Sequence, residues 1–105
     1  MSQTESSPDT KRRQDSVYIM RNSRIPDQFK VGRSQDVIRR KNDLERSQNF
    51  EMEILAIFPE AGRYEIAIHR ALAHLAVPNL PGREWFFGPL ADVVAVIIDV
   101  AHPPG

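Results

Sequence analysis

The sequence predicts an α/β domain of the α+β type, with a small, three-stranded, mainly antiparallel sheet flanked by helices in the order β-β-α-β-α-α. Two β-branched and aromatic segments follow one another across a turn-rich loop, and a third comes after an arginine-rich amphipathic stretch. Two further stretches have helical apolar spacing. A chain of 105 residues fits one domain. We expect this domain at 16–103, after a disordered polar tail over 1–15.

The first two strands are expected at 16–20 and 28–32. Val17-Tyr18-Ile19 supplies the strand-forming residues of the first. The intervening Asn-Ser and Pro-Asp pairs mark a turn, so we expect the two strands to form a hairpin with a longer loop. The second strand ends at Gly32, where the backbone must turn or approach another group closely.

Ser34 is expected to cap a helix over 36–46. The apolar positions of that helix are Val37, Leu44 and Ile38. Arg40 lies three residues after the first of these and four before the second, so it falls on the inward stripe. Arg39 shares another face with Asp43, and the two can form an ion pair there.

A third strand is expected at 50–58, because apolar residues alternate along it until Pro59. A helix over 61–75 follows, and its core stripe consists of Ile68, Leu72 and Leu75. Glu65 and His69 are four residues apart and share one side of this helix.

Two prolines and a glycine make 77–82 a loop, after which the aromatics of 85–87 are expected to pack back on the sheet. The last element, 89–101, carries a β-branched run that would also suit a strand. Asp92 and Asp99 are seven residues apart and would share one outer helix face, which favours a helix opened by Pro89.

The composition narrows the class of protein. The chain has no cysteine, which excludes a disulfide scaffold, a cysteine-ligated zinc site and a thiol nucleophile. No apolar run opens the sequence, so no secretory signal is expected. The longest apolar stretch, 93–98, is too short to span a bilayer. We therefore expect an intracellular protein without a membrane partner.

Charge is distributed unevenly although the net charge is zero. Residues 21–46 carry eight Lys or Arg against four Asp or Glu, an excess of +4. From residue 51 onward the counts are three against seven, an excess of −4. The first segment would form a basic face that attracts a polyanion such as nucleic acid. The alternative is a solvated helix face with internal ion pairs.

Five short elements, in order and at fitting spacings, resemble the GIY-YIG nuclease superfamily over about residues 16–87. These are Val17-Tyr18-Ile19, Lys30-Val31-Gly32, Arg40, the Glu65-to-His69 pair and Arg83-Glu84-Trp85-Phe86. The closest branch is the phage-type Orf172 DNA-binding branch, which is related to a meiotically up-regulated fungal protein. The sequence departs from the superfamily pattern at Val17, where the first motif has Gly, and at Lys30, where the second motif has Tyr.

The resemblance implies hydrolysis of DNA phosphodiesters with one divalent metal ion, Mg²⁺ or Mn²⁺. Glu65 would be its protein ligand, with water and phosphate oxygens completing the shell. Arg40 would clamp the phosphate, and Tyr18 would orient or deprotonate the attacking water. Lys30 would assist the phenol or bind phosphate as a point charge. His69 would be a second ligand, a general base or an orienting partner.

Ordinary structural roles remain open for each of these residues: a solvated carboxylate, an arginine lying over the core edge, a strand aromatic and a satisfied helix histidine. Gly32 and Glu84 would support the site. The DNA-binding residues are expected to be Arg33, Arg39, Lys41 and Arg46.

Three functions follow as hypotheses: a metal-dependent DNA endonuclease, an inactive DNA-binding module of the same fold, and a small protein-interaction domain. The expected partner is DNA. Because a domain of this length leaves no room for a recognition domain, a partner protein, a homodimer or DNA shape would supply targeting.

Overall fold

The structure, a computed structural model, describes residues 15–77 and 84–101. Residues 1–14 of the tail expected over 1–15, most of the loop over 77–82 and the end of the domain at 102–103 lie outside these ranges. The last residue of the expected tail, Asp15, is buried in the domain. The described residues form a four-stranded antiparallel sheet and three α-helices. The elements are β1 (Ser16–Asn22), β2 (Gln28–Ser34), α2 (Val37–Gln48), β3 (Met52–Phe58), α3 (Glu65–Ala71), β4 (Trp85–Phe87) and α4 (Leu90–Ala101). The predicted α+β class is confirmed, whereas the prediction of three strands is wrong.

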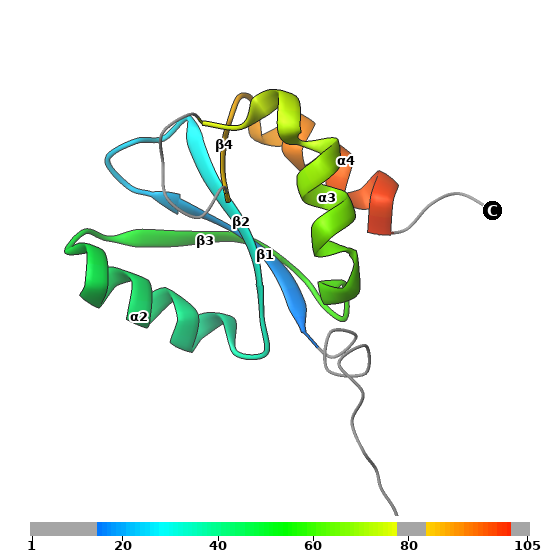
Figure 1. The fold of residues 1–105 in the computed structure, drawn as a ribbon. Coiled ribbons are helices and arrows are strands. Elements are labelled where there is room, and N and C mark those ends of the chain that lie inside the picture. The colour runs from blue at the N-terminus through cyan, green and yellow to red at the C-terminus, as the bar shows by residue number, and fades with distance from the viewer. Residues whose placement is uncertain (1–14, 78–83, 102–105) are drawn as a thin grey trace, which may run out of the picture.

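The strands lie in the order β3-β1-β2-β4 (Figure 1). Tyr18 on β1 is opposite Gly32 on β2. The fourth strand, β4, pairs with β2 only from Gln28 to Lys30. Beyond this pairing, the Val31 N–H still donates to the backbone carbonyl of Glu84 at 2.9 Å, whereas the Val31 carbonyl faces His69 of α3.

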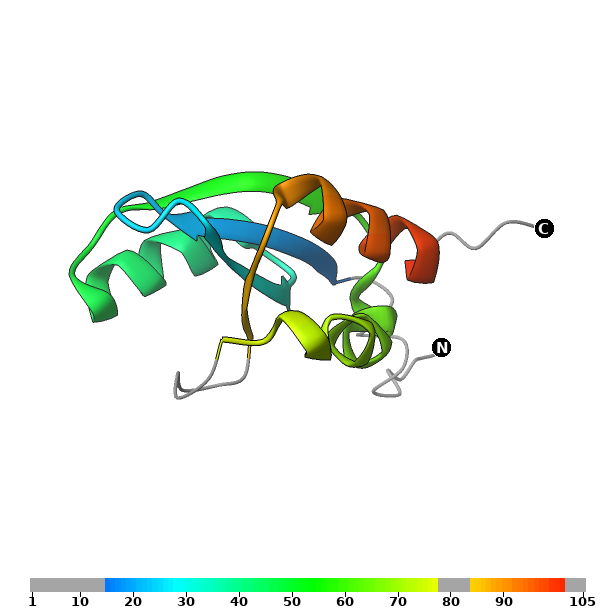
Figure 2. The same cartoon turned by 90° about the horizontal axis from the view of Figure 1, so that it is seen from above.

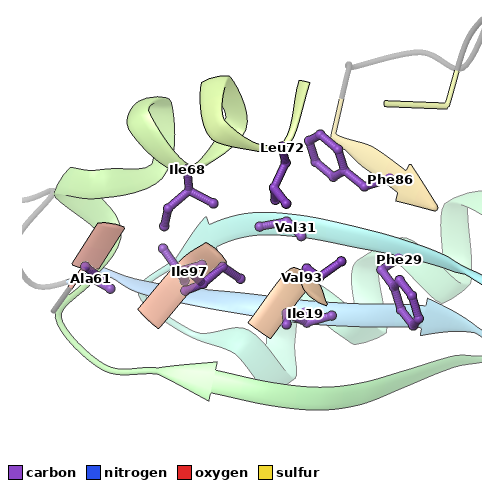
Figure 3. Packing of buried hydrophobic residues seen from close by; sticks show 11 residues of the cluster. Ile19, Phe29, Val31, Ala61, Ile68, Leu72, Phe86, Val93 and Ile97 are labelled. Carbon is purple, nitrogen blue, oxygen red and sulfur yellow. The ribbon is translucent and has the colours of Figure 1, made fainter. Parts of the chain in front are cut away.

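Different helices cover the two faces of the sheet (Figures 1 and 2). Because side chains alternate along a strand, odd-numbered positions of β1 and β2 pack beneath α3 and α4, as Figure 3 shows. This α3/α4 face holds Val17, Ile19, Phe29, Val31, Phe86, Ile68, Leu72, Val93 and Ile97. The opposite α2 face holds Tyr18, Met20, Met52, Trp85, Val37 and Leu44.

The helix α2 differs from its prediction at both ends. Asp36, rather than Ser34, caps it: the Asp36 Oδ1 accepts the Arg39 N–H at 3.0 Å, while the Ser34 hydroxyl accepts the Asp36 N–H. The C-terminus is Gln48, and Asn49 follows in the left-handed conformation with φ 59°. Ile38 was expected inside but is 59% exposed, because a residue adjacent to buried Val37 points about 100° away from it.

The predicted helix over 61–75 consists of three pieces. A 3₁₀ turn at Gly62–Tyr64 precedes α3, and a second at Ala73–Leu75 follows it. The Gly62 N–H donates to the backbone carbonyl of Asp15, which ties this first turn to the start of β1. Leu72, with φ −94° and ψ 1°, ends the α-helical portion. Glu65 is consequently the first residue of α3 and His69 lies one turn further on.

The structure answers two questions that the sequence left open in the C-terminal half: the conformation of 89–101 and that of 85–87. Residues 90–101 are helical, and Val93, Ile97 and Ala101 are buried at the spacing of one helix face. Trp85–Phe87 form a fourth strand, and the Trp85 and Phe86 side chains are buried in the core as predicted, whereas Phe87 is exposed. No helix within 15–77 or 84–101 is long and apolar enough to cross a membrane.

Candidate functional site

Four consecutive residues of β2, from Lys30 to Arg33, lie at the centre of the candidate site. Lys30 and Gly32 face α2, whereas Val31 and Arg33 face the side of α3. Side chains from β1, α2 and α3, together with Glu84 at the start of β4, converge on this short segment. The end of β2 thus brings together residues that are far apart in the sequence.

The Tyr18 phenol lies directly over the backbone of Gly32. A Cβ atom at position 32 would stand 2.6 Å from the Tyr18 hydroxyl oxygen and 2.8 Å from Cζ. It would also be 3.2 Å from Oε1 of Glu84. The prediction that the strand ends at Gly32 is wrong, because β2 continues to Ser34. The predicted close approach of another group is confirmed, and that group is the Tyr18 phenol.

Burial raises the pKa of the Tyr18 phenol above its ordinary value. Arg40 acts in the opposite direction, through side-chain hydrogen bonding and through its charge, while the charges of Glu84 and Glu65 add to the rise. Tyr18 is only 1% exposed. The phenol is therefore neutral near pH 7, and the cation that acts on it is Arg40, although Arg40 itself is an exposed residue of α2.

Lys30 was expected to assist the Tyr18 phenol or to bind phosphate, but its partner in the structure is Glu84. It is 6% exposed, and its Nζ donates to Oε1 of Glu84 at 2.8 Å. The same Nζ lies 5.8 Å from the centre of the Trp85 ring. A buried ammonium needs a carboxylate partner. Glu84 provides it, so Glu84 contacts the site by anchoring Lys30.

Glu65, the candidate metal ligand, belongs to a chain of charged groups that the sequence did not predict. Nε of Arg33 donates to Oε1 of Glu65 at 3.2 Å, and Nη1 of Arg33 donates to Oδ2 of Asp15. Asp15 is 5% exposed, and its Oδ1 has no hydrogen-bond partner within the described ranges. Arg33 was expected to contact DNA but instead bridges two carboxylates. No sequence motif singled out Asp15.

His69 contacts the outer edge of β2 at Val31, just past the residues that pair with β4. Its Nε2 lies 2.7 Å from the Val31 carbonyl oxygen and 4.0 Å from Oε2 of Glu65. Because a carbonyl oxygen only accepts, Nε2 carries a proton in this contact. That nitrogen is consequently not available as a metal ligand in this arrangement, and Nδ1 is left as the ring nitrogen that can accept a proton.

Glu65 could hold a divalent cation whose remaining ligands come from water and substrate. Where the structure describes the chain, no group of three or more His, Cys, Asp or Glu residues is placed to hold a metal ion. Oε1 of Glu65 is engaged with Arg33, and Oε2 makes no hydrogen bond among the described residues. Mg²⁺ commonly takes one or two carboxylates and fills its shell with water and phosphate oxygens. Glu65 fits that mode of binding.

Most of the basic residues in 21–46 have acidic partners. The ion pairs are Arg21–Glu53, Lys30–Glu84, Arg33 with Asp15 and Glu65, Lys41–Glu45 and Arg46–Asp43. Asp43 thus pairs with Arg46 rather than with Arg39. Of the expected DNA-binding residues, Arg39 alone has no ion pair within the described residues. Fewer basic side chains are therefore available to an anionic partner than the count of basic residues in the sequence indicates.

An open hollow of 730 Å³ lies elsewhere, at the C-terminal end of α2. Arg24, Lys41 and Phe50 are among its lining residues, and Tyr18, Arg40 and Glu65 are not. The candidate site is consequently a surface at the end of β2 rather than this hollow.

The fold and the site define an α+β domain in which a buried phenol on the central hairpin is combined with an arginine from α2 and a glutamate from α3. Residues 15–101 match the T5orf172 domain family, and the chain belongs to that family. No curated protein and no solved structure gave a match.

Proposed function

We propose that this T5orf172 domain acts on DNA as a metal-dependent endonuclease of the GIY-YIG type, in the phage-type branch of that superfamily. The observation that carries the proposal is the position of Tyr18, Arg40 and Glu65. They come from three elements, yet Arg40 and Glu65 both influence the pKa of the buried Tyr18 phenol, which Arg40 lowers and the Glu65 charge raises.

Each residue then has a distinct task at a DNA phosphodiester. Arg40 binds the phosphate, because its planar guanidinium can donate to two phosphate oxygens and is always charged. The neutral Tyr18 hydroxyl is buried beside Arg40 and positions its guanidinium by hydrogen bonding. Glu65 offers Oε2 to Mg²⁺ or Mn²⁺, which when bound would stabilise negative charge on the reacting phosphate.

His69 is the best candidate for proton acceptor in this scheme. With Nε2–H bonded to the Val31 carbonyl, Nδ1 is the ring nitrogen that can accept a proton. Tyr18 is less suitable, because its raised pKa keeps the phenol protonated at that pH.

A second candidate function is DNA binding without turnover. It is favoured by the surroundings of Lys30, which stands where the superfamily pattern has Tyr. The Lys30 ammonium is engaged by the Glu84 carboxylate at 2.8 Å, so it is not free to take the role that a phenol has at this position.

A supercoiled-plasmid nicking assay with Mg²⁺ or Mn²⁺ tests the proposal. The active protein nicks plasmid, EDTA stops the reaction, and Glu65→Gln reduces the rate by at least about 100-fold. Glu53→Gln is the matched control, because Glu53 also accepts an arginine Nε–H, at 3.1 Å, but lies at another part of the sheet.

The other results discriminate among the hypotheses. Salt-sensitive DNA binding without nicking supports the binding module. Absence of binding even at low salt refutes both DNA-directed functions and leaves the protein-interaction domain. Nicking by Glu65→Gln at the wild-type rate refutes the assignment of Glu65.

A further inference from the structure

Arg33 contacts the carboxylate that the proposed nuclease would use for its metal ion. Its Nε is 3.2 Å from Oε1 of Glu65, and its Nη1 is held by Asp15. The Glu65 side chain is 18% exposed and the Asp15 side chain 7%. The guanidinium is thus fixed at its far end by a buried carboxylate rather than free to leave Glu65.

The charges of this trio oppose one another. Two carboxylates and one guanidinium leave a net charge of −1, compared with −2 for the carboxylates alone. A cation approaching Oε2 of Glu65 is repelled by Arg33 and attracted by Asp15. Repulsion by the nearer group outweighs attraction by the farther one, and both are weakened by solvent because the Arg33 side chain is 35% exposed.

We propose that Arg33, anchored by Asp15, is a built-in counterion that competes with the divalent cation for Glu65. The inference rests on the proposed role of Glu65 and concerns the regulation of that site. In the protein without DNA, Arg33 neutralises Glu65 and keeps metal affinity low. A DNA phosphate then supplies both the missing negative charge and the additional oxygen ligands, so metal and DNA bind cooperatively.

Mn²⁺ binding to the full chain without DNA, measured by electron paramagnetic resonance or calorimetry at low ionic strength, tests this proposal. Arg33→Gln tightens Mn²⁺ binding by about tenfold, because it removes the competing charge. Asp15→Asn has the opposite effect and weakens binding by roughly twofold to threefold, because it removes an attractive charge. Arg21→Gln is the control, since Arg21 makes an equivalent contact with Glu53.

The opposite signs separate this role from a structural one, because a loosened fold would weaken binding in both variants. Thermal unfolding shows whether each variant is folded at the assay temperature. If Arg33→Gln is not, the double variant Asp15→Asn/Arg33→Gln removes both charges of this ion pair and is also expected to bind Mn²⁺ more tightly than the wild type.

Two results overturn the proposal and differ in what else they affect. If Mn²⁺ binding is lost in Glu65→Gln but unchanged or weaker in Arg33→Gln, the competition is refuted while Glu65 remains the metal ligand. If neither the wild type nor Arg33→Gln nor the double variant binds Mn²⁺ at millimolar concentration, the counterion role and the metal role of Glu65 both fail.

Discussion

Replacing Gly32 by alanine is the most sharply defined perturbation of the site. The added methyl group would stand 2.6 Å from the Tyr18 hydroxyl and 2.8 Å from Cζ. Tyr18 is packed between the sheet and α2, so its ring can move aside only by disturbing that packing, unlike an exposed side chain. Overpacking of this kind costs about 1–3 kcal/mol. At 2 kcal/mol, the Tm of a domain of this size falls by roughly 8–16 °C.

Thermal and urea unfolding of Gly32→Ala, in wild-type and Tyr18→Phe backgrounds, measures this cost and its origin. Removing the hydroxyl eliminates the closest contact while Cζ remains, so Gly32→Ala should cost less in the Tyr18→Phe background, by about 0.5–1 kcal/mol. Because the ring must shift away from Arg40, Gly32→Ala should also lower nicking activity.

The reasoning fails if Gly32→Ala unfolds within about 1 °C of the wild type. It also fails if the cost is the same with and without the Tyr18 hydroxyl, since the collision partner would then lie elsewhere.

Three further predictions concern charge. Glu84→Gln should lower the free energy of unfolding by about 1–2 kcal/mol, because buried Lys30 loses its carboxylate, whereas the exposed-pair control Glu53→Gln stays within about 0.5 kcal/mol; equal effects in urea unfolding would contradict this. In an absorbance titration, one of the two tyrosines should ionise above the ordinary phenol pKa, and Tyr18→Phe should remove that step. The native state should accordingly lose stability as the pH rises above about 10, where the unfolded phenol ionises and the folded one does not; ordinary titration of both phenols would refute the burial of Tyr18. DNA affinity should fall steeply with salt, and Arg39→Ala should reduce the slope of log K against log salt by about one; an unchanged slope would exclude a phosphate contact by Arg39.

Local sequence patterns predicted most of the elements but not the complete sheet. The β1–β2 hairpin and the helix after it follow from strand formers, turn residues and helical spacing. β4 was missed because a three-residue strand has too few positions to show alternation. Its strand conformation comes from pairing with β2 and from burial of Phe86 between the sheet and α3, which are tertiary effects. The broken helix around Glu65 was missed for a similar reason, since the Gly62–Asp15 hydrogen bond joins distant segments.

The candidate site was likewise predicted only in part. The spacing of Arg40 and the glycine at position 32 indicated where a phenol and a guanidinium could meet. The partners of the charged residues could not be foreseen, because Lys30 pairs with a residue 54 positions away and Arg33 with one 32 positions away. A count of basic residues therefore overstated the positive surface that folding leaves available.

The central claim, that Arg40 and Glu65 act on one phosphate, is tested most directly by single-turnover nicking rates of Arg40→Ala, Glu65→Gln and the double variant. Each single variant should lose at least about 100-fold. The double variant should be nearly as active as the slower single variant, because residues that serve one transition state are not additive. Losses that multiply in the double variant, or single variants as fast as the wild type, would contradict the claim.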